Sequence, residues 1–185
     1  MNKKHWREAL QDLPVDNGER LERFLRDYAS GMDIGLPTNP PPVHSHGNPK
    51  MDMVSKCKMA ETIIKWHGKG YLMGPYPKNH PIAQQCRINP VFCVDKPDGS
   101  VRPVVNYSKE IGGDSLNDLL DPDWCIVEYI KLKEIVYTIS QVGKGAMIWA
   151  KDLEDGYFNI KIRPDQTKAI AFVFAGLLFI PMVLV

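Results

Sequence analysis

The segment KDLEDGYFNIKI, residues 151–162, sets charged and aromatic residues at the end of an apolar approach. Asp152 directly follows the short apolar run at 147–150, so a strand ending there would hold its carboxylate partly buried and oriented. A carboxylate in that setting suits a hard cation such as Mg²⁺. Asp155-Gly156 is also a common turn dipeptide, and an ordinary hairpin would use it between two strands. Spacing alone favours the hairpin and leaves the metal site open.

A second candidate site lies in PVFCVDKPDGSVRPVVNY, residues 90–107. Two strand-like runs flank the sequence PDGS at 97–100, whose residue types are those of a turn. Lys96 and Arg102 stand on either side of this tip. Two cations on a projecting hairpin suit a triphosphate, whose charge must be neutralised before attack. The alternative is a surface hairpin that its charges keep soluble.

Composition limits the class of protein. The chain has 185 residues and 44% apolar residues, enough for the core of one domain or of part of a larger one. The net charge of +1 hides an asymmetry, because residues 50–110 carry +5 and residues 111–165 carry −4. This division suits a protein that binds polyanions in one half and cations in the other, and it equally suits two solvated faces that differ. Four cysteines without a Cys-x-x-Cys pair indicate reduced residues in an intracellular protein.

The periodicity of apolar residues predicts an α+β fold, because helices and hairpins alternate without strict β-α-β order. Helices are expected at 17–30, 52–67 and 127–142, each ending near a glycine. Strands are expected at 90–96, 101–107, 147–150 and 157–162. A proline-rich linker at 35–49 separates the first helix from the rest, which predicts a division into residues 1–49 and 50–185.

The uncharged run AIAFVFAGLLFIPMVLV, residues 169–185, is at the lower edge of membrane-spanning length. Gly176 and Pro181 interrupt it, and its residue types suit buried strands. We therefore expect two buried strands around a turn at Ala175-Gly176 and no membrane contact.

The order of these motifs resembles the fingers and first palm motif of reverse transcriptases. The resemblance is close at VFCVDKPDGSVRPVVNYS and at AKDLEDGYFNIKIRPDQ. KGYLMGPYP, SLNDLL and QVGKGAMIWAKDL are most similar to the tyrosine-recombinase (DIRS-type) retrotransposon branch. The resemblance covers residues 68–185, about two thirds of the chain. It implies an α+β fold of fingers and incomplete palm, with RNA-directed DNA polymerase activity on a template with primer and dNTP.

The same resemblance assigns roles to individual residues. It implies that Asp152 and the backbone carbonyl of Leu153 bind two Mg²⁺ ions. It gives Lys96 and Arg102 contacts with the phosphates of the nucleotide. It implies that the incoming nucleotide is contacted by Asp155, Gly156 and Tyr157. The backbone N–H groups of Asp155 and Gly156 would touch the triphosphate, and the Tyr157 ring would exclude a ribose 2′-hydroxyl.

One element of a complete polymerase does not occur in this sequence. The second metal-binding motif of reverse transcriptases, Tyr/Phe-x-Asp-Asp, is absent. One half of a carboxylate pair cannot position two metals about 3.5–4 Å apart. We therefore expect an incomplete catalyst, a fragment of an RNA-directed DNA polymerase. The alternative is a catalytically inactive nucleic-acid-binding remnant of a truncated retroelement, and in either case an intracellular protein.

Overall fold

The computed structural model describes residues 18–36, 40–45, 47–122, 131–145, 147 and 156–184. Its main sheet has four strands in the order β1-β6-β5-β2, and a separate two-stranded hairpin pairs β3 with β4. Pairing within the main sheet is antiparallel except between β5 and β2, which run parallel. The strands are β1 (Leu72–Pro77), β2 (Ile88–Asn89), β3 (Val91–Asp95), β4 (Val101–Val105), β5 (Ala171–Phe174) and β6 (Leu177–Pro181).

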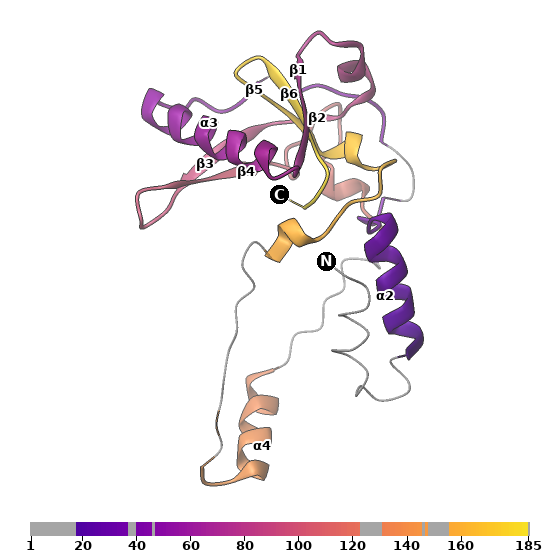
Figure 1. Ribbon diagram of the computed structural model, residues 1–185, viewed down its shortest axis with the longest axis vertical. Coiled ribbons are helices and arrows are strands. Elements are labelled where there is room, and N and C mark those ends of the chain that lie inside the picture. The colour runs from indigo at the N-terminus through magenta and orange to yellow at the C-terminus, as the bar shows by residue number, and fades with distance from the viewer. Residues whose placement is uncertain are drawn as a thin grey trace.

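Helix α3 lies against these strands (Figure 1). The α-helices are α2 (Gly18–Ser30), α3 (Met53–Gly68) and α4 (Leu132–Val142). Short 3₁₀ helices connect the strands: η2 (Pro81–Gln85), η3 (Asn117–Leu119), η5 (Gly156–Asn159) and η6 (Thr167–Ile170). Helices mixed with antiparallel hairpins confirm the expected α+β class.

Alternate residues of β5 and β6 point to opposite faces of the main sheet, and other elements cover both faces. Phe172 and Phe179 stack with ring centroids 5.5 Å apart on the face that α3 and the β3–β4 hairpin cover. Ala171 and Leu178 pack against η2 on the other face. Strands covered on both sides read as continuous apolar sequence, which is why residues 169–185 approach the length of a membrane span.

The expected turn at Ala175-Gly176 is confirmed. Phe174 pairs with Leu177, and the two residues between them have φ of 50° and 79°. Positive φ at both central residues is the geometry of a tight hairpin turn, and glycine adopts it without strain. Among the residues that the structure describes, no helix is long and apolar enough to cross a membrane.

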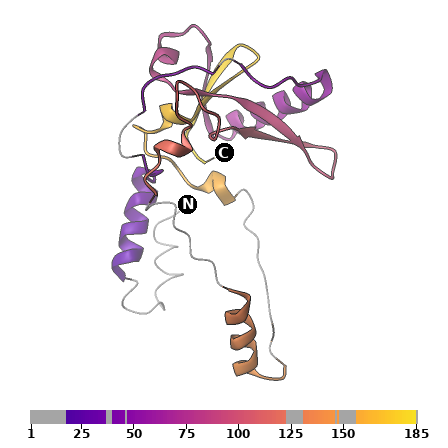
Figure 2. The ribbon, with the colours of Figure 1, turned by 180° about the vertical axis from the view of Figure 1, so that it is seen from behind.

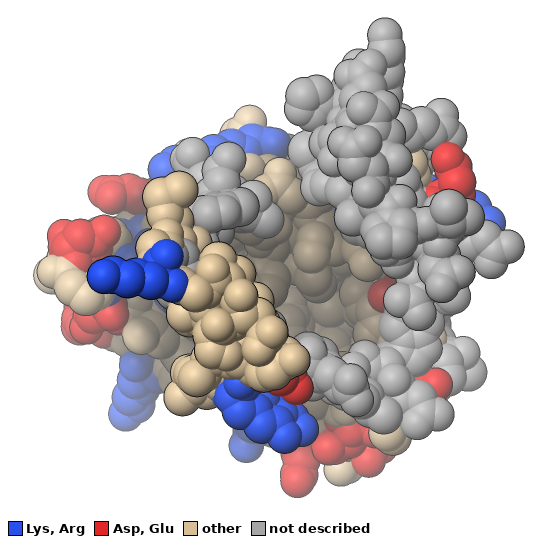
Figure 3. Space-filling view, turned by 90° about the horizontal axis from the view of Figure 1, so that it is seen from below, with Lys and Arg blue, Asp and Glu red and all other residues tan. Residues whose placement is uncertain are grey.

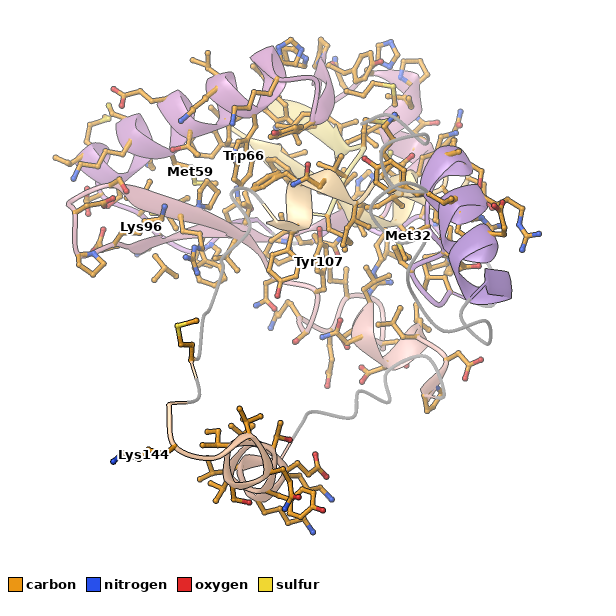
Figure 4. The ribbon with its side chains drawn as sticks, turned by 60° about the horizontal axis from the view of Figure 1, so that its bottom comes forward. Met32, Met59, Trp66, Lys96, Tyr107 and Lys144 are labelled. Atoms are coloured by element: carbon orange, nitrogen blue, oxygen red, sulfur yellow. The ribbon has the colours of Figure 1, made fainter. Side chains whose placement is uncertain are left out.

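Helix α3 starts and ends where local chemistry favours it. The Asp52 carboxylate accepts hydrogen bonds from the Ser55 backbone N–H at 2.7 Å and from its hydroxyl at 2.9 Å. These bonds lower the pKa of Asp52 and satisfy donors at the helix N-terminus. Met59 and Ile63, on the face toward the hairpin, are buried, as the helical spacing predicts (Figure 4).

The segment after α2 is fastened to the core by a polar network. Gly31, at φ 94°, ends α2 and passes directly against the backbone of Ile162. The buried Gln166 side chain accepts a hydrogen bond from the Ile34 N–H and donates one to Asp33. Arg163 forms an ion pair with the same aspartate at 2.6 Å. Residues 31–36 therefore fold together with residues 161–166, far along the chain.

The strand expected at 157–162 is wrong, although its pattern of burial is right. Residues 156–159 form η5, in which the Ile160 N–H donates to the Tyr157 carbonyl at 2.9 Å. Phe158 and Ile162 still point inward while Tyr157 is exposed. Isolated bridges follow, pairing Lys161 with Val183 and Ile162 with Met32. Alternating burial therefore comes from a 3₁₀ turn and an extended tail rather than from a strand.

Helix α4 lies apart from the sheet in both ribbon views (Figures 1 and 2). It ends at Val142 with Gly143 as its C-cap, as expected, but Lys131, inside the expected helix at 127–142, has an extended backbone and precedes the first helical residue, Leu132. Most apolar residues of this helix are exposed, with Leu132 at 74% and Val136 at 57%. Viewed from the α4 end, uncharged side chains cover much of the described surface (Figure 3). Met147, the first residue of the expected strand 147–150, is not in a strand, and the rest of that segment lies outside the described residues.

Candidate functional site

A groove of about 590 Å³ opens between α3, the β3–β4 hairpin and η5. Three segments that are distant in sequence form its walls. The lining residues are Thr62, Lys65, Trp66, Lys69, Lys96, Ser100, Val101, Arg102, Pro103, Val104, Gly156, Tyr157 and Phe158. Its volume lies within the range of small-molecule and cofactor sites.

The hairpin wall carries the two cations that the sequence singled out. Arg102 pairs with Val94 across the hairpin, and Lys96 lies two residues beyond Val94, so both cations project from one face. The turn closes through bonds from the Lys96 N–H to the Ser100 carbonyl and from the Gly99 N–H to the Lys96 carbonyl. Lys96 and Arg102 both line this groove, and their binding of phosphates stays a prediction.

The α3 wall was missed by the sequence reasoning. Its groove residues follow helical spacing: Thr62, Lys65, Trp66 and Lys69. The Lys69 ammonium lies 5.5 Å from the centroid of the Tyr71 ring, within cation–π range. The signal was present in the sequence, since two lysines and a tryptophan share one face of the helix. Which face meets the groove depends on the packing of Met59 and Ile63 on the hairpin.

The third wall, η5, is anchored by an aromatic cluster. The Phe158 ring stacks on Tyr71 with centroids 4.9 Å apart and lies 5.1 Å from Trp66 at a tilt of 54°. Figure 4 shows Trp66 between α3 and this segment. The anchored ring fixes its neighbours Gly156 and Tyr157 at the groove, where the Tyr157 side chain remains 74% exposed. The structure therefore brings Gly156 and Tyr157 to the same groove as Lys96 and Arg102.

Two contacts hold the α3 and hairpin walls at a fixed separation. The Lys58 ammonium donates to the Gly99 carbonyl at the hairpin tip, at 2.6 Å. Behind the groove, Met59 and Ile63 belong to one buried cluster with Val101 and Val105. A groove with such walls is largely formed before a ligand arrives, which lowers the entropy cost of binding.

The described lining of the groove is positively charged. Four of its lining residues are Lys or Arg, and none of the described lining residues is Asp or Glu. Cations on low-dielectric walls focus a positive potential and attract polyanions. The exposed Tyr157 ring and the Ser100 hydroxyl add a stacking and a hydrogen-bonding group. The chemistry matches a ligand with several phosphates attached to a flat ring system.

The remaining predicted site residues, Asp152, Leu153 and Asp155, lie outside the described residues. Within the part of the chain that the structure describes, no group of three His, Cys, Asp or Glu side chains could hold a metal ion. The expected magnesium site therefore stays a prediction.

Comparison with known proteins rests on solved structures, since no family model and no curated protein matches the chain. The native crystal structure of the prototype foamy virus protease-reverse transcriptase matches with a TM-score of 0.56 and 19% identity. The match covers 100% of this chain and 24% of that one. The chain therefore has a reverse transcriptase-like fold.

Two further structures of the foamy viral protease-reverse transcriptase agree. One, in complex with dsDNA, has a TM-score of 0.54 and 15% identity, and the match covers 100% of this chain and 38% of that one. Another, in complex with an RNA/DNA hybrid, has a TM-score of 0.52 and 14% identity, with 100% and 25% covered. The chain thus spans well under half of the length of these neighbours, and the region it matches is similar to their fingers and palm.

Proposed function

We propose that this chain is part of a retroelement RNA-directed DNA polymerase, most like the DIRS-type branch, that adds dNTP to a primed template. The observation that carries the proposal is the shared groove of Lys96, Arg102, Gly156 and Tyr157. These four residues come from two distant segments, and the family resemblance independently assigns all of them to one nucleotide. A positive groove with an exposed ring suits a deoxynucleoside triphosphate.

In this proposal each wall of the groove has one task. Lys96 and Arg102 neutralise and orient the phosphates, as charge-assisted donors. The Gly156 backbone approaches the triphosphate closely because it has no side chain, and the Asp155 backbone N–H lies next to it in sequence. The Tyr157 ring occupies the space that a ribose 2′-hydroxyl would need and so favours deoxynucleotides.

Asp152 and the Leu153 carbonyl would hold Mg²⁺, for which carboxylate and carbonyl oxygens are the preferred ligands. When bound, the metal supplies activation of the primer hydroxyl and stabilisation of charge on the transferring phosphoryl group. The sequence contains no Tyr/Phe-x-Asp-Asp motif, and the chain matches only 24–38% of its structural neighbours. We therefore assign catalysis to a longer polypeptide that includes this chain.

Primer extension tests this proposal. A polypeptide carrying this chain together with a Tyr/Phe-x-Asp-Asp segment should extend a primer on an RNA template with dNTPs and Mg²⁺. Asp152→Asn should lower extension by about a thousandfold or more, because the neutral amide binds the metals poorly. Glu61→Gln, a matched change at an exposed position of α3 outside the groove, should leave it unchanged. Full activity of Asp152→Asn would disprove the catalytic assignment.

A second candidate function is nucleic-acid binding without catalysis. The absence of the second carboxylate motif from the sequence favours it, and the foamy viral neighbours have been solved with dsDNA and with an RNA/DNA hybrid. Under this candidate the chain binds template–primer with an affinity that falls as salt rises, and no added segment confers extension. Extension by the longer polypeptide would rule it out.

A further inference from the structure

The groove carries more positive charge than the proposed phosphate contacts use. Lys96 and Arg102 project from the hairpin, while Lys65 and Lys69 line the opposite wall, on α3. The α3 pair has no role in the function proposed above. Because they are cations that line the same cavity, they suit the same kind of ligand, an anionic phosphate.

Helix α3 itself offers a different explanation for one of these lysines. Lys65 belongs to the last turn, where a cation favours the negative end of the helix dipole. The helix dipole does not explain why Lys65 lies on the wall of the groove, together with Thr62 and Trp66. It also leaves out Lys69, which follows the helix and reaches the groove beside the Tyr71 ring.

The two pairs of cations lie on walls that are joined to each other. The Lys58–Gly99 hydrogen bond and the buried cluster behind the groove keep α3 and the hairpin from separating. Cations on both walls can contact an anionic ligand from two sides, and the positive potential between low-dielectric walls attracts anions. A chain of phosphates carries its charge along its length and can meet both walls at once.

We infer that Lys65 and Lys69 bind the polyphosphate of the incoming nucleotide from α3, opposite Lys96 and Arg102, so that a four-cation clamp selects triphosphates over monophosphates. This inference rests on the proposed function and adds two specificity-determining residues to it. The hairpin pair holds one side of the phosphate chain, and the α3 pair holds the other. A nucleoside monophosphate has a single phosphate group and therefore offers fewer anionic oxygens to the four cations.

Equilibrium binding of dATP, dAMP and inorganic tripolyphosphate to the 185-residue chain tests the clamp. Divalent metal is removed with EDTA, so that binding reports the side chains alone. Lys65→Gln with Lys69→Gln keeps most of the length of the side chains and removes both charges. We expect this double variant to bind dATP and tripolyphosphate about tenfold or more weakly, as lost charge-assisted hydrogen bonds dictate, and to bind dAMP almost unchanged.

Two matched variants complete the design. Lys56→Gln changes a lysine on α3 that lies outside this groove, and it should bind all three ligands like the wild type. Lys96→Gln with Arg102→Gln should weaken dATP binding on its own. Circular dichroism melts of each variant exclude unfolding as the cause, and Lys65→Arg with Lys69→Arg should restore dATP affinity.

The outcomes separate the clamp from the polymerase assignment. If the α3 double variant binds dATP as tightly as the wild type while the hairpin variant weakens, the clamp is disproved and the proposed function stands. If both double variants weaken dATP binding but the longer polypeptide does not extend primers, the clamp stands and the polymerase assignment fails. If the wild-type chain binds none of the three ligands, the groove is no phosphate site and both proposals are overturned.

Discussion

Tyr157 owes its position to its neighbour Phe158, whose ring lies against Trp66 and Tyr71. The anchored ring leaves Tyr157 74% exposed at the groove. A large, flat side chain with few rotatable bonds is well suited to excluding a substituent from a bound sugar. The role of Tyr157 as a sugar filter stays a prediction, and the structure shows that its ring is exposed at the groove.

Replacing Tyr157 tests that role. In the longer polypeptide, Tyr157→Ala should raise ribonucleotide incorporation relative to deoxynucleotide incorporation by about tenfold to a hundredfold, because space opens for the 2′-hydroxyl. Tyr157→Phe keeps the ring and should retain the wild-type preference. The ratio of kcat/KM for dATP and ATP measures the effect. An unchanged ratio in Tyr157→Ala would show that another group reads the sugar.

Tyr107 makes stability depend on pH in the alkaline range. Its ring contacts two of the buried clusters, and loss of hydration raises the pKa of its phenol above the ordinary value of 10.0. The folded chain therefore keeps this proton at pH values where the unfolded chain loses it. The resulting contribution to stability is complete below about pH 10 and declines as the pH rises above that value.

We expect Tyr107→Phe to lose less stability than the wild type between pH 9 and pH 11. This interval spans the ordinary tyrosine pKa of about 10. Urea unfolding at each pH gives the free energies. Tyr137→Phe, at a tyrosine that is 65% exposed, serves as the control and should follow the wild type. Parallel pH curves for wild type and Tyr107→Phe would contradict the predicted raised pKa.

Residue types and short-range spacing predicted one side of the groove. Lys96 and Arg102 share a face because a strand has a period of two and the turn between them has four residues. Gly156 and Tyr157 were assigned through the family resemblance and lie in the same groove. Lys65 and Lys69 were missed because only tertiary packing decides which face of a helix meets a cavity. Asp152 lies outside the described residues.

At the scale of elements, the predictions agree with the structure where side chains form local hydrogen bonds at the ends of helices and in turns. Helix α3 and the β3–β4 hairpin match their predictions because Asp52 caps the helix and Asp98 accepts bonds from the Ser100 N–H and hydroxyl within the turn. The 3₁₀ helix η5 replaces a predicted strand. The burial of alternate residues there comes from the stacking of Phe158 on Tyr71, and alternating burial alone does not specify a strand backbone.

The close contact between the backbones of Gly31 and Ile162 predicts that a side chain at residue 31 would destabilise the fold. A Cβ at Gly31 would lie 2.6 Å from the Ile162 carbonyl oxygen, and φ is +94°. Gly31→Ala should therefore destabilise the chain by about 2–4 kcal/mol through clash and strain. Gly68→Ala, at the end of α3 where a Cβ meets nothing within 4 Å, should change stability by at most about 1 kcal/mol. Denaturant unfolding of both variants makes the comparison, and equal effects would refute the close crossing.

At the scale of the whole molecule, the core and α4 differ sharply. Met59 is fully buried between α3 and the hairpin, while Val136 of α4 is 57% exposed. Met59→Ala should cost about 2–4 kcal/mol because it leaves a cavity, whereas Val136→Ala should stay within about 0.5 kcal/mol of the wild type. Thermal melts followed by circular dichroism distinguish the two. A large loss for Val136→Ala would mean that α4 packs in solution.

Segments that are distant in sequence pack together to form the groove, so local sequence patterns could not predict all of its walls. Its walls come from residues 62–69, 96–104 and 156–158, and the contacts that join them include a hydrogen bond, an apolar cluster and an aromatic stack. The sequence predicted α3, the β3–β4 and β5–β6 hairpins and the α+β class, because apolar periodicity and turn chemistry are local properties. It did not predict β1 and β2, and it placed a strand where η5 lies. How the elements enclose a site is a property of the folded molecule.

The central claim is that this groove binds the nucleotide, and a titration of the ¹⁵N-labelled chain with dATP tests it most directly. Backbone amide signals should shift for Gly156 and Tyr157, for Arg102 on β4, and along residues 62–69 of α3. A second groove, lined by Pro40, Gln84, Gln85 and Lys168 among others, should show no change. Shifts centred on that second groove, or no shift at the first one under saturating dATP, would contradict the account.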